Sequence, residues 1–171
     1  MPHDDAIARL ARQIDATSKS ERFSATTPAV AALRLQGAAE LHRTCSEFVG
    51  SVNGELADAT LELSPPQFRP EMFRERGANI IQIGSQGRQM QITFEAARMP
   101  ISTEKFLIPY VLEGEVRAYN QKMLERMEIR SQLLFYCVEA NQASWRFYDW
   151  RTARTGPVSR AMLASLMEPL F

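Results

Sequence analysis

Residues 132–151 constrain the fold more than any other stretch, because they are typical of a β-hairpin whose first strand is apolar on both faces. Successive side chains of a strand point to opposite sides of a sheet. One face would carry Leu133, Phe135 and Cys137, and the other Leu134, Tyr136 and Val138. Burying a large apolar side chain is worth about 1.5–3 kcal/mol, so we expect both faces to be covered. A long helix can cover one face, and either the terminal helices or a symmetry-related subunit can cover the other.

Two helices are predicted ahead of the strands. The first begins near Asp4, ends near Ser18 and repeats its apolar residues at i, i+3, i+4 and i+7, namely Ile7, Leu10, Ala11 and Ile14. The second helix has Thr27 as its N-cap and Pro28 in its first position. Its apolar stripe runs through Leu41, Cys45, Phe48, Val52 and Leu56.

From Thr60 the hydrophobic period changes to two, which predicts a series of strands. We expect strands at 60–63, 79–83, 89–95 and 106–119, the last interrupted near Gly114, followed by the final hairpin. Residues 115–128 also fit a helix, and we favour a strand to Tyr119 with a helical turn after it. A short C-terminal helix follows Gly156-Pro157, with an apolar side formed by Met162, Leu163, Leu166 and Met167.

These elements predict one α+β domain over residues 1–171. A long N-terminal helical segment would pack on an antiparallel meander of five or six strands, and the short C-terminal helix would close the molecule. Residues 1–24 are a candidate for a mobile N-terminal helix or arm.

The charge balance argues against partners, such as nucleic acid, whose binding needs a strong electrostatic field. Twenty Lys and Arg residues balance twenty Asp and Glu residues, so nucleic acid is a disfavoured partner. The N-terminal residues lack the features of a signal peptide, and no run approaches the ~20 apolar residues that cross a bilayer. We therefore expect a cytoplasmic protein with no membrane partner. Cys45 and Cys137 fall on different predicted elements and are expected to be buried thiols.

An aromatic and basic run at the end of the hairpin is the best candidate binding surface. Its members are Trp145, Arg146, Tyr148, Trp150, Arg151 and Arg154. Aromatic rings beside Arg side chains can stack on bases, sugars or the side chains of a partner. The alternative is that Trp145 belongs to the core and that the aromatic residues are ordinary cross-strand pairs.

An anionic small ligand is a further candidate near Arg151 and Arg154. Both precede the predicted C-terminal helix, and free amide groups at a helix N-terminus favour anions. The spacing matches no phosphate-binding loop, and Gly156-Pro157 is also explained as the start of the helix.

No catalytic, metal or cofactor site is predicted. His42 and Cys45 lie three residues apart, but Cys45 falls on the apolar stripe, where a thiolate is disfavoured. Glu113 and Glu115 flank Gly114, and two carboxylates beside a turn are typical of a solvated surface.

The sequence favours a small non-enzymatic binding or protein-interaction module that self-associates through sheet or helix surfaces, with a homodimer or another protein as its partner. The alternative is a small-molecule binding protein or enzyme with a pocket between the long helix and the sheet. The polar contacts of such a pocket would come from Arg117, Tyr110, Tyr119 and Tyr136.

Overall fold

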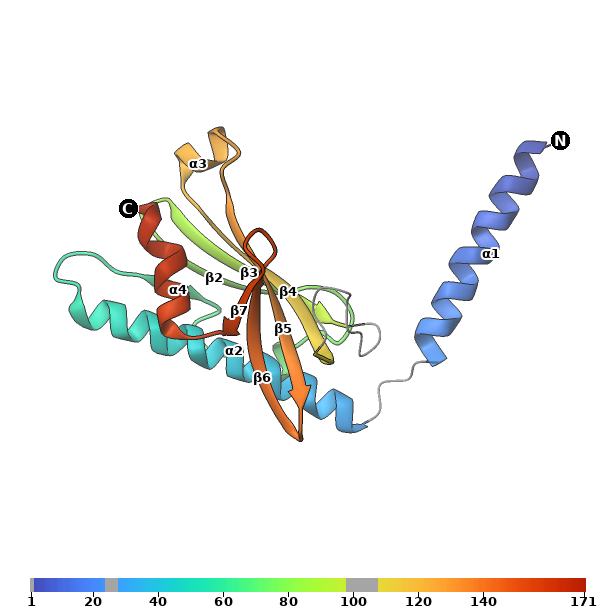
Figure 1. Cartoon of the computed structure of the whole chain (residues 1–171), viewed down its shortest axis with the longest axis horizontal. Coiled ribbons are helices and arrows are strands. Elements are labelled where there is room, and N and C mark those ends of the chain that lie inside the picture. The colour runs from blue at the N-terminus through green and yellow to red at the C-terminus, as the bar shows by residue number, and fades with distance from the viewer. Residues whose placement is uncertain (1, 24–27, 98–107) are drawn as a thin grey trace.

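A computed structural model describes residues 2–23, 28–97 and 108–171 of the chain. Its body is one antiparallel sheet of seven strands, which lie side by side in the order in which they occur along the chain. A long helix and a short C-terminal helix pack on the same face of this sheet (Figure 1). The α+β class is as predicted, and the sheet has seven strands rather than five or six.

The helices are α1 (Pro2–Phe23), α2 (Pro28–Glu55), α3 (Gln121–Glu125) and α4 (Arg160–Met167), with short 3-10 turns at Pro70–Met72 and Glu168–Leu170. The strands are β1 (Glu62–Ser64), β2 (Asn79–Ser85), β3 (Arg88–Ala96), β4 (Tyr110–Tyr119), β5 (Arg130–Glu139), β6 (Gln142–Asp149) and β7 (Arg154–Pro157).

Helix α2 forms where the apolar stripe predicted it. Leu41, Cys45 and Phe48 are buried against the sheet, and Val52 is half-buried at the edge of the same core. Because these residues recur every three or four positions, they share one side of the helix. Helix α4 adds Leu163 and the other predicted apolar residues to this core.

Strand β5 is covered on both faces, as its composition predicted. Leu134 and Tyr136 point into the core beneath α2, whereas Phe135 and Cys137 lie in a second, smaller apolar cluster on the outer face of the sheet. All four side chains are buried. The double burial explains why this strand shows no polar alternation.

The cover of the outer face differs from what was expected. The described residues that pack there beside β5 and β6 are Ala97 and Ile108 from the connection between β3 and β4, and Tyr110 at the start of β4. Helix α4 lies on the α2 side. Helix α1 stands apart from the body in Figure 1, and residues 5–15 are exposed along its length.

The remaining differences are local. The first helix continues past Ser18 to Phe23, and β7 occupies part of the segment expected to lead into the C-terminal helix. Gly114 does not interrupt β4, and a Cβ atom there would lie 2.4 Å from the carbonyl oxygen of Thr93. Residues 115–128 divide as favoured, into strand and then helix, with the side chain of Asn120 capping α3.

Candidate functional site

Trp145 points into the core rather than to the surface. Its indole Nε1 donates to the carbonyl oxygen of Gly37 on α2 at 2.7 Å. Its ring packs edge-on against Phe94 and at a tilt against Tyr136, with centroids 5.7 Å and 5.4 Å away. Trp145 therefore anchors β6 to the long helix and has no exposed surface for stacking on a ligand.

Arg146 and Tyr148 lie on the outer face of the sheet. Tyr148 is buried in the outer cluster, and Arg146 stands opposite Phe135 in the β5–β6 ladder. The Nε atom of Arg146 is buried and has no hydrogen-bond partner among the described residues. Burial raises the pKa of the neighbouring Cys137 thiol to about 12, although the Arg146 charge acts in the opposite direction. Reactivity is therefore not expected of this thiol.

The other three members of the predicted surface meet at the turn between β6 and β7. Trp150 is 54% exposed, and the guanidinium carbon of Arg151 lies 5.1 Å from the centroid of its ring. Asp149 accepts a hydrogen bond from the backbone N–H of Arg151 at 3.0 Å and pairs in register with Arg154. The predicted set is thus divided among the core, the outer face and this turn.

A cleft of about 710 Å³ adjoins the same turn, between the α3 region and α4. Arg130 and Arg151 line it together with Glu128 and Asp149. Two guanidinium groups and two carboxylates give this lining no net formal charge.

The two parts of the predicted anion site are not brought together. Helix α4 begins at Arg160, and its N-cap Ser159 already accepts a hydrogen bond from the backbone N–H of Met162. Arg154 lies at the far end of β7 from that helix. The helix N-terminus and the Arg pair are therefore separate features.

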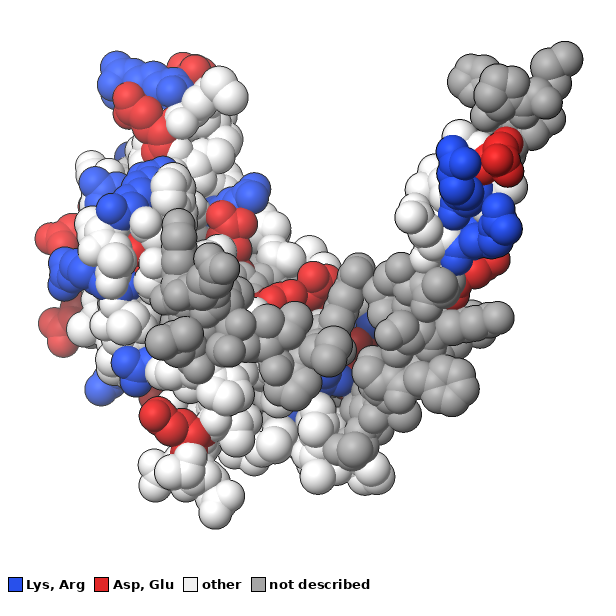
Figure 2. Space-filling model, turned by 45° about the vertical axis from the view of Figure 1, so that its right-hand side comes forward, with Lys and Arg blue, Asp and Glu red and all other residues white. Residues whose placement is uncertain are grey.

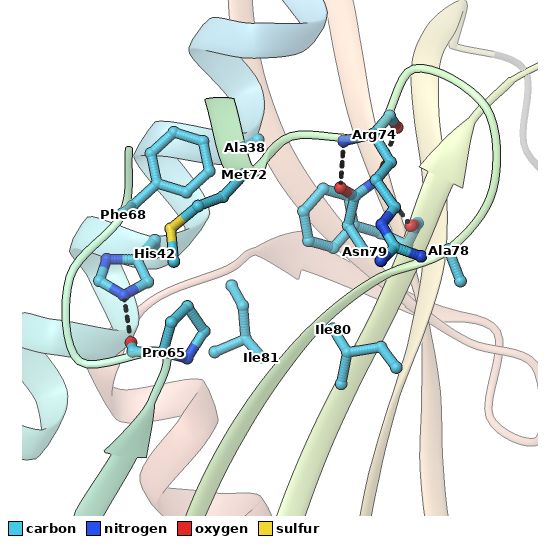
Figure 3. A pocket seen from close by; sticks show the side chains of 11 residues that line it. Ala38, His42, Pro65, Phe68, Met72, Arg74, Ala78, Asn79, Ile80 and Ile81 are labelled. Atoms are coloured by element: carbon cyan, nitrogen blue, oxygen red, sulfur yellow. Dashed lines mark hydrogen bonds between the residues drawn. The ribbon is translucent and has the colours of Figure 1, made fainter. Parts of the chain in front are cut away.

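A small cavity of about 240 Å³ lies where α2, β2 and the segment after β1 meet (Figure 3). His42 borders it, and its Nε2 atom lies 2.7 Å from the carbonyl oxygen of Pro65. Asn79 is also engaged, accepting from the backbone N–H of Arg74 at 2.8 Å. Ligand pockets commonly measure about 300–1,000 Å³ and present free polar groups. The volume of this cavity falls below that range, and His42 and Asn79 already have hydrogen-bond partners.

Cys45 cannot act with His42 as a nucleophile. The thiol is fully buried, and burial raises its pKa from 9.0 to about 12. A thiol with this pKa stays protonated at neutral pH and is a poor nucleophile and a poor metal ligand.

The side chains proposed for a small-molecule pocket lie on different faces. Tyr136 is in the core and donates through its hydroxyl to Glu40 at 3.2 Å. Tyr110 belongs to the outer cluster, and Arg117 forms an ion pair with Glu115 at 3.0 Å. Burial and the neighbouring Glu113 carboxylate raise the pKa of Tyr110. Tyr136 and Tyr110 therefore lie in two different apolar clusters, on opposite faces of the sheet.

Sequence reasoning overlooked a shallow apolar groove between the end of α2 and helix α4. Its volume is about 580 Å³. One wall consists of Phe48, Val52 and Leu56 and the other of Ala161 and Ala164, and Ser51, Glu55 and Arg160 complete the lining. One side of the groove belongs to the predicted apolar stripe of α2. Ala161 and Ala164 lie outside the predicted apolar side of the C-terminal helix, so only the packing of α4 beside α2 reveals the groove.

In the part of the chain that the structure describes, no three His, Cys, Asp or Glu side chains gather to hold a metal ion. Among the described helices, none combines the length and apolar composition needed to cross a lipid bilayer. Comparisons of the chain with protein-family models, with curated proteins and with solved structures find no match.

Proposed function

We propose that this protein is a non-enzymatic protein-interaction module that self-associates through α1. The observation that carries the proposal is the apolar stripe of this helix. Ile7, Leu10 and Ile14 share one side of α1 and are 65%, 57% and 56% exposed. A stripe of large apolar side chains in water is typical of an interaction surface.

The opposite side of α1 is charged. Arg9 forms an ion pair with Asp5 one turn away, at 3.5 Å, and Arg12 extends this polar side. Figure 2 shows charged side chains gathered on one side of the helix, with an uncharged side next to them. This division is typical of a helix that packs against another surface.

The exposure of α1 supports the same proposal. This helix has 22 residues, and most helix stability in proteins comes from packing of the apolar face rather than from helix propensity. Docking of the stripe on a partner surface would supply that packing. The core beneath α2 and α4, by contrast, is formed by side chains of the body itself.

The test is sedimentation velocity of the full chain at micromolar concentrations, comparing Leu10→Glu with Ala8→Glu. Both substitutions add one negative charge to α1, but Ala8 lies off the stripe. We expect the unmodified chain and Ala8→Glu to sediment as dimers and Leu10→Glu to sediment as a monomer. A monomeric unmodified chain, or a Leu10→Glu variant that remains a dimer, would contradict the proposal.

A further inference from the structure

The groove between α2 and α4 is open along one side and lined mainly by apolar atoms. Phe48, Val52 and Leu56 form one wall, and Leu56 is 40% exposed. The other wall consists of two small residues, Ala161 and Ala164. Small side chains on one wall let the backbone of an incoming helix approach closely.

We propose that the occupant of this groove is α1 of a second copy of the chain, so that two copies exchange their α1 helices. This inference rests on the proposed self-association and assigns its contact surfaces. Exchange of one element between two identical chains forms a closed dimer in which both stripes and both grooves are covered.

The dimensions of stripe and groove agree. Ile7 and Ile14 are seven residues apart, which is about 10 Å along a helix. Phe48 and Leu56 are eight residues apart, or about 12 Å at the same rise per residue. Three stripe side chains can therefore lie along the full length of the groove.

The charges at the edges also agree. One charge of each sign, Arg160 and Glu55, borders the groove, and the Arg160 guanidinium donates to the hydroxyl of Ser51 at 3.1 Å. Asp15 follows directly after the last isoleucine of the stripe and is exposed. A docked α1 can bring the Asp15 carboxylate beside the Arg160 guanidinium. Opposite charges at this contact favour docking, whereas like charges would oppose it.

Pairing of two α1 helices with each other is less favourable than docking of α1 in the groove. The stripe places Ile7, Leu10 and Ile14 in three successive core positions of a helix pair, which is about two heptads. Sequences that form coiled coils usually sustain the pattern over at least three or four heptads. The groove offers a preformed apolar surface instead.

Docking of α1 on the groove of its own chain is also less favourable. The groove begins at Phe48, about 30 Å along α2 from Pro28 at 1.5 Å per residue. Of this distance, the nine residues from Phe23 back to Ile14 can cover about 14 Å. The five peptide steps from Phe23 to Pro28 span at most about 18 Å, so they would have to run almost fully extended along α2 to cover the rest. A second copy imposes no such restriction.

The experiment is a cysteine cross-link between two different full-length variants. Leu10→Cys and Ala164→Cys are mixed, equilibrated and oxidised, and a mixture of Ala8→Cys with Ala164→Cys serves as the control. Both native thiols are buried, so they do not compete. We expect a disulfide-linked pair of one Leu10→Cys chain and one Ala164→Cys chain, with little product in the control mixture.

A second measurement uses α4 without a cross-link. Ala164→Glu places a charge in the groove, whereas Ser165→Glu places the same charge at an exposed neighbour outside it. We expect Ala164→Glu to weaken dimerisation by about tenfold or more and Ser165→Glu by less than about twofold.

The outcomes separate the two proposals. A dimer that links Leu10→Cys to itself, or that Ala164→Glu leaves intact, would overturn the groove assignment while self-association stands. An intramolecular disulfide in a monomeric Leu10→Cys/Ala164→Cys double variant would overturn both. A chain that stays monomeric at every concentration would also overturn both.

Discussion

Trp145 joins three parts of the molecule at one position. The indole N–H bonds to the helix α2 through Gly37, and the ring lies between Phe94 of β3 and Tyr136 of β5. Phe94 lies far from Trp145 along the chain, whereas Tyr136 is its cross-strand partner in the β5–β6 hairpin. The side chain therefore combines a buried hydrogen bond with the packing of helix on sheet.

Replacement of Trp145 by Phe should lower the free energy of unfolding by about 1–3 kcal/mol, because the buried carbonyl of Gly37 loses its donor and a smaller ring leaves space. Urea unfolding followed by circular dichroism would measure this change. The matched control is Trp150→Phe, since Trp150 is largely exposed, and a surface substitution usually stays within about 0.5 kcal/mol. Equal effects at the two positions would contradict the role assigned to Trp145.

The two cysteine thiols should not react while the protein is folded. Burial raises the pKa of both Cys45 and Cys137 to about 12, so the reactive thiolate is scarce at pH 8. A thiol reagent such as Ellman's reagent should modify neither native thiol and should modify two per chain in denaturant. Rapid reaction of the native protein would show that one of these sites is open to solvent.

The same thiols should make the fold less stable in alkali. The unfolded chain releases the Cys45 proton near pH 9.0, whereas the folded chain holds it to about pH 12. The unfolded state then binds fewer protons, so stability is fully present below pH 9 and declines as the pH rises towards 12. Urea midpoints measured at several pH values should fall over this window, and the decline should be smaller in Cys45→Ala.

At the scale of the elements, α2 can approach the sheet closely only because Gly37 lacks a side chain. A Cβ atom there would lie 2.5 Å from Cδ1 of Tyr136 and 2.9 Å from Cδ1 of Leu112. Gly50 lies on the same helix with nothing within 4 Å of such an atom. The two glycines therefore serve as a matched pair for testing how the helix packs.

Gly37→Ala should destabilise the protein by about 1–3 kcal/mol through overpacking, whereas Gly50→Ala should stabilise it by about 0.5–1 kcal/mol because Ala is the better helix former. Opposite shifts in the urea midpoint would confirm this packing of α2. Two shifts of the same sign would mean that Gly37 does not mark the closest approach of helix and sheet.

Most elements could be predicted because their patterns are local. The apolar stripe of α2 and the doubly apolar strand β5 each follow from residues close in sequence. Strand β7 could not be predicted in this way. It has four residues, and Gly156-Pro157 is equally typical of the start of a helix.

The arrangement of the candidate binding surface could not be predicted from local sequence patterns alone. Alternation separates Trp145 from Arg146 and Tyr148, but it does not say which face meets α2. Only the assembled core places Trp145 inside and leaves Trp150, Arg151 and Arg154 at a turn. The α2–α4 groove was not predictable either, because its two walls are about 105 residues apart along the chain.

At the scale of the whole molecule, exchange of α1 would link thermal stability to protein concentration. A dimer that forms only from folded chains is favoured by mass action, so its midpoint of thermal unfolding rises with concentration. We expect calorimetry to show this rise for the unmodified chain and for Ala8→Glu. The midpoint of Leu10→Glu should be independent of concentration, and a concentration-independent midpoint for all three chains would contradict self-association.

The order of the sheet has a consequence for how the chain folds. Every strand neighbours the next one along the chain, so the meander can grow by closing one short loop at a time, which costs little entropy. The contact between Trp145 and Gly37 instead spans 108 residues, and contacts of such long range slow folding. We therefore expect the hairpins to form early and the docking of the helix across them to be the slow, committing event.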